Sequence, residues 1–260
     1  MKIRKSNPIA SIIIVNYNNA KYLNKSVNSA LNQNYKSKEI IVIDDNSSDN
    51  SIKILQTYKK KIFIIKKKKK FKYGSYNQIQ SYFKGFLKSK EKYIFFLDSD
   101  DYFKKNKIKN VIDHFEKNKK INVIFDLPIL KYKKRNEKKK FKQKNFLLSS
   151  WPRFSNQSCI SAKRNFARKL FKISKINRFN TIWFDFRIAS YCYLKEKKID
   201  ILEKYLTYYR QLDNSASKKY KTFSKDWWKR RNEAHDFMTY LNKKLKIKDK
   251  LNIDKIITKI

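Results

Sequence analysis

The chain has 260 residues, with 65 lysines and arginines against 22 aspartates and glutamates, for a formal net charge of +43. Its hydrophobic fraction of 41% is enough for one large core or two small ones. No run approaches the roughly 18–20 apolar residues that span a bilayer, the start lacks the features of a signal peptide, and Cys159 and Cys192 form no metal motif. We therefore expect a cytoplasmic protein with free thiols.

The basic charge has two interpretations. A lysine run at 66–70 and a base-rich stretch at 131–144 favour contact with nucleic acid. Alternatively, abundant Lys, Asn, Ile, Phe and Tyr with 2 glycines and 3 prolines is the composition that an AT-rich genome imposes on any protein. The bases are spread along the whole chain without a recognisable nucleic-acid motif, so we expect no specific nucleic-acid partner.

Apolar runs of strand length alternate with amphipathic helical patterns in the first half of the chain. In chain order we expect a strand at 9–15, a helix at 20–31, a strand at 39–43, a helix at 49–58, a strand at 62–65, a helix at 75–87, a strand at 93–97, a helix at 107–116 and a strand at 121–127. Continuous apolar strands that alternate with helices indicate a parallel sheet covered on both faces. The fold class is α/β, with a Rossmann-like, doubly wound unit.

Polar clusters follow three of these strands. They read NYNN at 16–19, DDNSSD at 44–49 and DSDD at 98–101, and the last two hold six of the 22 acids of this basic chain. Ligands of such sheets bind outside the carboxyl ends of the strands. Any one cluster can be a turn or a helix cap, and Ser48 or Asp49 fits that interpretation. The DSDD acids would repel one another unless a cation or a donor network held them, which suggests a metal-assisted phosphate site.

The succession IASIIIVNYNNAKYL, EIIVIDDNSSDNS and YIFFLDSDDYF resembles the nucleotide-binding half of the family-2 glycosyltransferases of GT-A fold. The resemblance covers 8–118. The segment 181–217 resembles the acceptor side of the family, with an acid at the start of a helix and a Tyr-Arg pair on the following strand. The stretch 128–160 matches poorly, as expected for the part that shapes acceptor choice.

The resemblance implies a role for each matching residue. Val15 and Tyr17 would line the pocket for base and ribose, and Asp45 would bond the base edge. Asp98 would contact the ribose or the metal shell, and Asp100 would be the principal ligand of a divalent cation, Mg²⁺ or Mn²⁺, that bridges the diphosphate. Asp185 matches the general base, although it is also placed to cap a helix. Asn77 would contact the donor.

The sequence departs from the family pattern at two positions next to these residues. Asn46 stands where the family usually has glycine, but asparagine also tolerates a left-handed backbone. The usual Glu-Asp pair is Phe184-Asp185 here, so the first carboxylate is missing. The assignment of Asp185 as the base therefore depends on the second carboxylate alone.

We weighed this function against three others. A haloacid-dehalogenase-type phosphatase also has a DxD after an apolar strand, but Tyr102 occupies its Thr or Val position. A sugar nucleotidyltransferase needs a glycine-rich loop where NYNN stands. A basic nucleic-acid or scaffold protein, including a degenerate transferase that binds without turnover, remains the non-enzyme alternative. We expect a metal-dependent, inverting glycosyltransferase that moves a sugar from a UDP-sugar to a glycan or lipid-linked acceptor of the cell envelope.

We expect two regions, a GT-A domain at 1–218, made of a donor half (8–118) and an acceptor half (119–218), and a basic helical tail at 219–260. Within the tail one helical stripe is predicted to pack on the domain, namely Phe223, Trp227, Ala234, Met238, Leu241 and Leu245. Trp228 and Tyr240 lie off that stripe among lysines, which suits either an anionic membrane surface or a solvated face.

Overall fold

The computed structural model describes residues 10–68, 71–141, 151–196, 199–213, 215, 220–249 and 252–259. Four parallel strands form one half of its sheet, in the spatial order β3-β2-β1-β4. They are β1 (Ala10–Asn16), β2 (Lys38–Asp44), β3 (Phe63–Lys66) and β4 (Tyr93–Asp98). β1 and β2 are apolar without alternation because helices cover both of their faces. The predicted parallel unit is confirmed.

The other half of the sheet is mixed. It continues through β8 (Ile160–Lys163), β6 (Val123–Lys131), β9 (Ile201–Arg210) and β5 (Tyr102–Phe103), and β7 (Asn136–Lys138) pairs with β6. β8 runs antiparallel between β4 and β6, whereas β6 and β9 are parallel. β6 extends to Lys131, beyond the predicted end at 127, because its last residues pair with both β9 and β7. Since β6 and β9 run in the same direction as β4, the carboxyl end of β9 lies at the same edge of the sheet as the end of β4.

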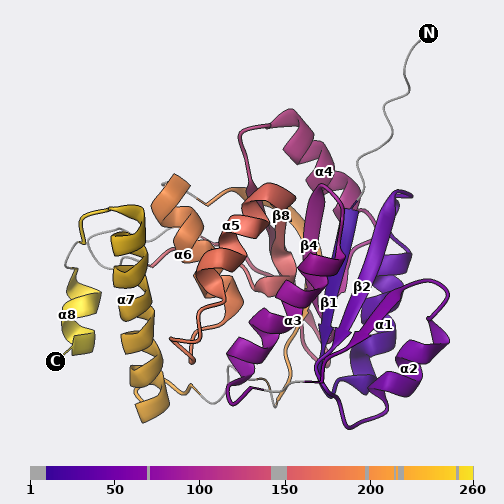
Figure 1. Cartoon of the computed structure of the whole chain (residues 1–260), viewed down its shortest axis with the longest axis horizontal. Helices are drawn as coiled ribbons and strands as arrows, with labels where there is room; N and C mark the ends of the chain where they lie inside the picture. The colour runs from indigo at the N-terminus through magenta and orange to yellow at the C-terminus, as the bar shows by residue number, and fades with distance from the viewer. Residues whose placement is uncertain are drawn as a thin grey trace.

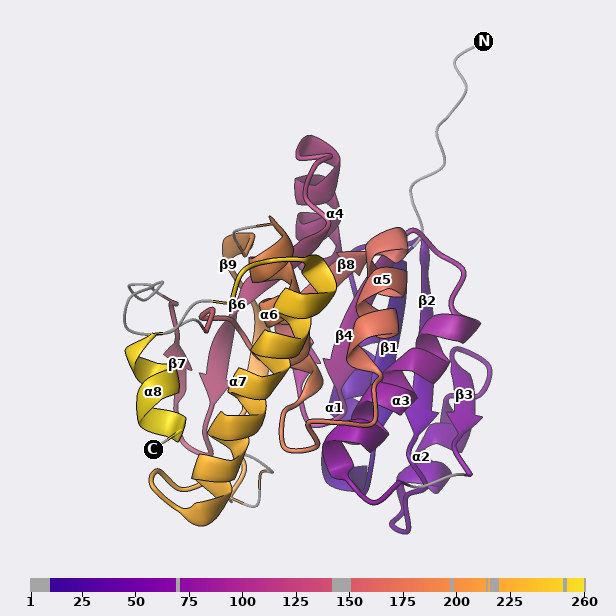
Figure 2. The ribbon, with the colours of Figure 1, turned by 60° about the vertical axis from the view of Figure 1, so that its left-hand side comes forward.

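Helices cover the two faces of the sheet in separate groups. The strand residues alternate between two cores, with Ile13 and Val15 in one and Ile12 and Ile14 in the other. The first core also contains side chains of α3 (Gly74–Lys88), α5 (Arg164–Ser174), α6 (Phe184–Glu196) and α7 (Lys225–Leu245), which lie together on one side of the sheet in Figure 2. The second contains side chains of α1 (Ala20–Leu31), α2 (Ser51–Thr57) and α4 (Lys107–Lys117).

Helix α3 approaches β1 and β2 closely at Gly85. A Cβ atom built at this glycine would collide with Cγ2 of Ile13 and would lie 3.4 Å from Cγ1 of Ile43. Glycine is therefore required here for the spacing between helix and sheet.

The C-terminal helices belong to the same body. Ala234, Phe237, Met238 and Leu241 of α7 lie in the core shared with α3, α5 and α6, and α8 (Ile253–Lys259) packs on α7 at the end of the molecule opposite α2 (Figure 1). Three of these four are residues of the predicted stripe. Phe223 of that stripe is 73% exposed, because it precedes the helix. Trp227 is half-buried.

Both cysteines are buried free thiols, as predicted. Within the described ranges, no helix is long and apolar enough to cross a membrane.

Candidate functional site

The three polar clusters predicted from the sequence meet at the carboxyl edge of the parallel strands. In the register of the sheet Asn16 of β1 lies beside Asp44 of β2, and Val15 lies beside Asp98 of β4. The Asn16 side-chain amide donates to Asp44 at 2.9 Å and to Ser47 at 3.1 Å. The strands thus place the clusters together, as parallel topology predicts.

Part of the second cluster has a structural role. Asp49 accepts hydrogen bonds from the backbone N–H of Ala20 at 2.9 Å and of Ser51 at 3.0 Å, at the first residues of α1 and α2. Asp49 thus has a structural role in the turn, although the N-cap positions of α1 and α2 are Asn19 and Asn50. Asn46 has a φ of 62°, so the asparagine takes the left-handed conformation that the family pattern assigns to glycine.

The residues expected at the base pocket differ in exposure. Val15 is 8% exposed and Asp45 is 6% exposed, whereas Tyr17 is 44% exposed at the edge of the sheet. Asp45 forms an ion pair with Lys67, a buried residue of the lysine run that follows β3. Burial lowers the pKa of Lys67, and the hydrogen bond and charge of Asp45 act against that shift. Asp45, the acid expected to bond the base edge, is thus held beside the Lys67 ammonium.

Asn77 anchors the chain that carries Lys67. Its Oδ1 accepts from Lys67 Nζ at 3.1 Å and from the Phe71 N–H at 2.8 Å. Its Nδ2 donates to the carbonyls of Phe71 at 2.7 Å and Tyr73 at 3.1 Å. These bonds occupy both ends of its amide and tie Lys67 to the loop before α3.

Two residues of α3 hold Asp98. Its Oδ1 accepts from the Tyr82 hydroxyl at 2.8 Å and from Gln78 Nε2 at 3.1 Å. Burial raises the pKa of Asp98 to about 7, with repulsion from Asp100 and Asp185 adding to the effect and the Tyr82 and Gln78 bonds opposing it. A donor network, one of the two alternatives for holding the DSDD acids together, is therefore present at Asp98, and its donors there come from α3.

Asp101 fastens the DSDD loop to the rest of the sheet. Its Oδ2 accepts from the Ser158 hydroxyl at 2.6 Å, and its Oδ1 accepts from the Arg210 N–H at 2.9 Å. Ser158 Oγ also accepts from the Asp98 N–H at 3.0 Å, and Arg210 Nε donates to the Asp100 carbonyl at 2.6 Å. The loop that presents Asp98 and Asp100 is thereby fixed by residues from β9 and from the turn before β8.

A fully buried ion pair lies behind this loop. Lys107 Nζ is 2.6 Å from Asp126 Oδ2, and both residues are 0% exposed. The ammonium also donates to the Ser158 carbonyl at 2.6 Å and to the Thr207 hydroxyl at 2.7 Å. The Thr207 hydroxyl is 2.7 Å from Asp126 Oδ1. This network of Lys107, Asp126, Thr207 and Ser158, here called the buried network, joins α4, β6, β9 and the turn that holds Asp101.

Asp185 reaches the same site from the far half of the chain. It lies in the first turn of α6, and its Oδ1 accepts from the Phe186 N–H at 2.7 Å. Burial raises the pKa of Asp185, while the charge of Arg230 on α7 lowers it. Burial also raises the pKa of Tyr209 on β9, with further contributions from Asp101, Asp185, Asp100 and Asp98. The charges of all four carboxylates therefore act on the same tyrosine.

The carboxylates of the site suit a divalent cation only when a substrate supplies further ligands. Among the residues that the structure describes, no group of three or more His, Cys, Asp or Glu side chains is arranged to hold a metal ion. Magnesium-type sites often use one or two carboxylates together with substrate phosphates. Asp98 and Asp100, whose pKa values are raised chiefly by burial, fit an arrangement of two carboxylates completed by substrate phosphates.

Sequence reasoning missed most of the residues that support the site. Lys67 lies in a lysine run that looks solvated, and Lys107 stands in the first turn of an amphipathic helix. Tyr82 and Gln78 lie within a predicted helix, but nothing in their spacing points to Asp98. The Tyr-Arg pair on β9 was the one signal that could be used.

Comparisons with known proteins agree with this geometry. A family model described as "Glycosyl transferase family 2" matches residues 11–174. An uncharacterized glycosyltransferase of Nostoc sp. is 28% identical over 215 residues, which cover 77% of this chain and 64% of that protein. The Escherichia coli enzyme named UDP-Glc:alpha-D-GlcNAc-diphosphoundecaprenol beta-1,3-glucosyltransferase WfaP is 39% identical over 115 residues, covering 44% of this chain and 43% of the enzyme. The chain thus spans less than two thirds of these relatives.

Solved structures show the same fold. Staphylococcus aureus TarS (residues 1–349) in complex with UDP-GlcNAc superposes with a TM-score of 0.62 at 16% identity, over 88% of this chain and 66% of that one. The mannosyltransferase PcManGT of Pyrobaculum calidifontis, in complex with GDP-Man and Mn²⁺, superposes with a TM-score of 0.62 at 10% identity, over 98% of this chain and 69% of that one. The family match covers well over half of the chain, which therefore belongs to glycosyltransferase family 2 and has the GT-A fold.

Proposed function

We propose that the protein transfers a sugar from a nucleoside diphosphate sugar to a hydroxyl group of a glycan or a lipid-linked acceptor, with inversion at the anomeric carbon. The observation that carries this proposal is that Asp185 lies near enough to Asp98 and Asp100 for the charges of all three to act on Tyr209, and for Asp185 to raise the pKa of Asp98. Asp98 ends β4, Asp100 follows in the next loop, and Asp185 lies in the first turn of α6. Family 2 membership and the GT-A fold support the same chemistry.

The nucleotide would lie at the ends of β1 and β2. Val15 and Tyr17 would line its base and ribose, and Asp45 would accept a hydrogen bond from the base edge. Lys67, whose ammonium bonds Asp45, Asn77 and Ser81, would hold that carboxylate in place for the base.

Asp98 and Asp100 would hold a divalent cation, Mg²⁺ or Mn²⁺, together with the diphosphate. When bound, the cation would stabilise the negative charge that develops on the departing nucleoside diphosphate. Tyr82 and Gln78 orient Asp98, and Arg210 holds the Asp100 backbone, so the ligands are placed before the substrate arrives. The Mn²⁺ bound with GDP-Man in PcManGT supports this assignment.

Asp185 would act as the general base. An acceptor hydroxyl is a weak nucleophile until a positioned carboxylate takes its proton. One oxygen of Asp185 is held by the Phe186 N–H, which leaves the other for the acceptor. Arg230 favours the ionised form that a base needs.

The donor and acceptor classes rest on the relatives. The solved TarS complex contains UDP-GlcNAc, and WfaP is named for a UDP-glucose donor and a diphosphoundecaprenol-linked acceptor. We therefore propose a UDP-sugar donor and an acceptor of envelope glycan synthesis. A cytoplasmic location at an anionic membrane surface is part of the proposal. It is supported by the exposed Phe223 beside Trp227 and Trp228, with exposed lysines at 221, 225 and 229.

A binding screen followed by a transfer assay tests the proposal. Calorimetric titration of the protein with UDP, GDP and their sugars, with and without Mn²⁺, should show metal-dependent binding with a preference for uridine. Incubation with the preferred donor should then release UDP faster when an acceptor is added. Metal-independent binding, or the absence of binding to every nucleotide, would contradict the assignment and favour a non-catalytic GT-A protein.

A further inference from the structure

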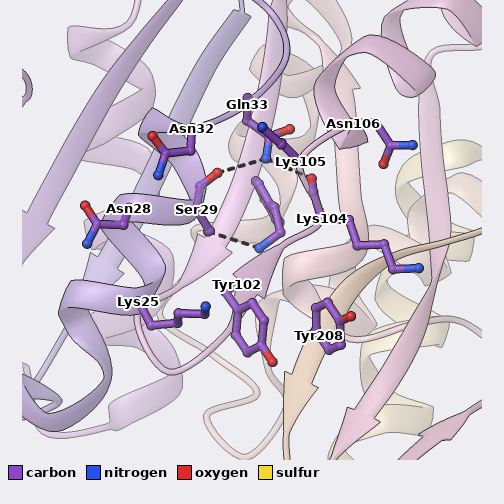
Figure 3. Close-up of a pocket in the computed structure, with 11 residues that line it drawn as sticks. Lys25, Asn28, Ser29, Asn32, Gln33, Tyr102, Lys104, Lys105, Asn106 and Tyr208 are labelled. Carbon is purple, nitrogen blue, oxygen red and sulfur yellow. Dashed lines mark hydrogen bonds between the residues drawn. The ribbon is translucent and has the colours of Figure 1, made fainter.

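A groove lies beside the DSDD loop, between α1 and the chain that joins β5 to α4. Its volume is about 820 Å³, and its lining includes Lys25, Tyr102, Lys104, Lys105 and Tyr208 (Figure 3). Pockets that hold small organic ligands measure about 300–1,000 Å³, so this groove, here called the lysine groove, accommodates more than a single phosphate.

The floor of the lysine groove is rigid. Gln33 Nε2 donates to the carbonyls of Ser29 and Lys104, both at 2.8 Å, and its Oε1 accepts from the Ile108 N–H at 3.0 Å. The Lys104 N–H donates to the Leu206 carbonyl at 2.8 Å. The backbone that carries the lysines is therefore held by α1, α4 and β9, and little of it needs to be ordered when a ligand binds.

The charge of the groove has one sign. Its lining contains three lysines and no aspartate or glutamate, and the remaining polar lining residues are amides, tyrosines and a serine. Such a surface has no carboxylate ligand for a hard cation, which distinguishes it from the neighbouring carboxylate site. Lysine ammonium groups bind phosphate as point charges, while amides and hydroxyls bond the hydroxyl groups of a saccharide.

Two stacked tyrosines connect the groove to the candidate reaction centre. The rings of Tyr102 and Tyr208 lie 4.5 Å apart at an interplanar angle of 11°. Lys25 Nζ lies 5.2 Å from the centre of the Tyr102 ring, and Figure 3 shows its side chain directed along the same edge of the groove. The Arg210 guanidinium, whose Nε bonds the Asp100 carbonyl, also lies 5.2 Å from that ring. The Tyr102 wall of the groove is thus linked through Arg210 to the loop that carries Asp98 and Asp100.

We propose that the lysine groove is an acceptor subsite for a glycan chain that carries phosphodiester groups. The proposal rests on the transferase function proposed above and specifies its acceptor class. Phosphates of the chain lie against Lys25, Lys104 and Lys105, and its hydroxyl groups lie against the amides. A neutral oligosaccharide gains the amide contacts but none of the charge–charge contacts, so it binds more weakly.

Direct binding of a defined probe tests this assignment separately from catalysis. A fluorescently labelled synthetic oligo(glycerol phosphate) is titrated against the whole protein at low and at moderate salt, with maltohexaose and a single-stranded DNA of equal charge as comparison probes. Lys25→Gln/Lys104→Gln is compared with the matched control Lys53→Gln/Lys59→Gln, which removes the same charge from exposed positions in and after α2. Mn²⁺-dependent UDP binding is measured for every variant.

The groove variant is expected to bind oligo(glycerol phosphate) roughly tenfold more weakly than the wild type, while the control variant loses less than roughly twofold. Both variants retain UDP binding. The proposal is overturned if the wild type does not bind the probe, because there is then no subsite. It is also overturned if the two variants lose equal affinity, or if DNA binding falls as much as probe binding, because the loss is then a general effect of charge. If UDP binding is absent while the groove-specific loss remains, the transferase assignment fails and the polyanion site stands.

Discussion

Replacing Lys107 by methionine tests whether the buried network stabilises the fold around the carboxylate loop. The substitution removes an ammonium that lies 2.6 Å from Asp126 Oδ2 and leaves Asp126, which is 0% exposed, with the Thr207 hydroxyl at 2.7 Å. Removing one partner of a buried ion pair costs about 3–5 kcal/mol. Because domains are stable by about 5–15 kcal/mol, the variant should fold with a much smaller free energy of unfolding.

The double variant Lys107→Met/Asp126→Leu separates the pair from its surroundings. It removes both charges and leaves the Ser158 carbonyl and the Thr207 hydroxyl without the ammonium donor, at a cost of about 1–3 kcal/mol. The double variant should therefore be more stable than the single one. Lys109→Met, at an exposed position of the same helix, is the matched control and should change stability by less than about 0.5 kcal/mol.

Urea unfolding followed by circular dichroism at pH 5 and pH 7 measures these differences. Burial raises the pKa of Asp126, and Lys107 lowers it, so loss of the lysine raises it further. A carboxyl whose pKa is raised on folding binds more protons in the folded state, and stability then falls as the pH rises through that window. The single variant should lose more at pH 7 than at pH 5. A loss below about 1 kcal/mol at pH 7, or a double variant no more stable than the single one, would refute the reasoning.

Four further predictions concern the site and the C-terminal helix. Asp100→Ala should abolish Mn²⁺-dependent UDP binding in calorimetry without loss of helical signal, and undiminished affinity would contradict the metal assignment. Asp185→Asn should keep donor binding but lower kcat and kcat/KM together by about 10²–10⁴-fold; transfer at the wild-type rate would make Asp185 a cap alone. Arg230→Gln removes a charge that lowers the pKa of Asp185, so the acid limb of the pH–rate profile should move to higher pH, whereas Arg230→Lys should leave it in place. Trp228→Ala should weaken salt-sensitive binding to anionic vesicles in co-sedimentation, and a wild-type protein that does not bind them at low salt would end the membrane proposal.

The sequence predicts the donor half of the fold well because its strands are covered on both faces. Continuous apolar runs then identify the strands, and the polar residues after β1, β2 and β4 must meet at one edge. The insertion of β8 between β4 and β6 could not be predicted, since it depends on pairings between distant segments. Lys107 illustrates a further limit, because an amphipathic pattern gives no sign that a lysine in the first helical turn is buried.

The same limit applies to Lys67, where a lysine run conceals one buried partner of Asp45. Tyr240 was expected at an anionic membrane surface or on a solvated face, yet its ring packs 5.9 Å from that of Phe179 and 6.2 Å from that of Phe237. The side of a helix that meets its neighbour depends on how the elements pack, which periodicity alone does not give.

The close contact at Gly85 has a consequence for how this sequence can vary. The chain has only 2 glycines among 260 residues, and one of the two stands where α3 meets Ile13. Gln78 and Tyr82, which bond Asp98, lie on the same helix. A methyl group at Gly85 would lift the helix from the sheet and draw both donors away from the carboxylate. Gly85 therefore affects the site indirectly, because the positions of Gln78 and Tyr82 beside Asp98 depend on how closely α3 approaches the sheet.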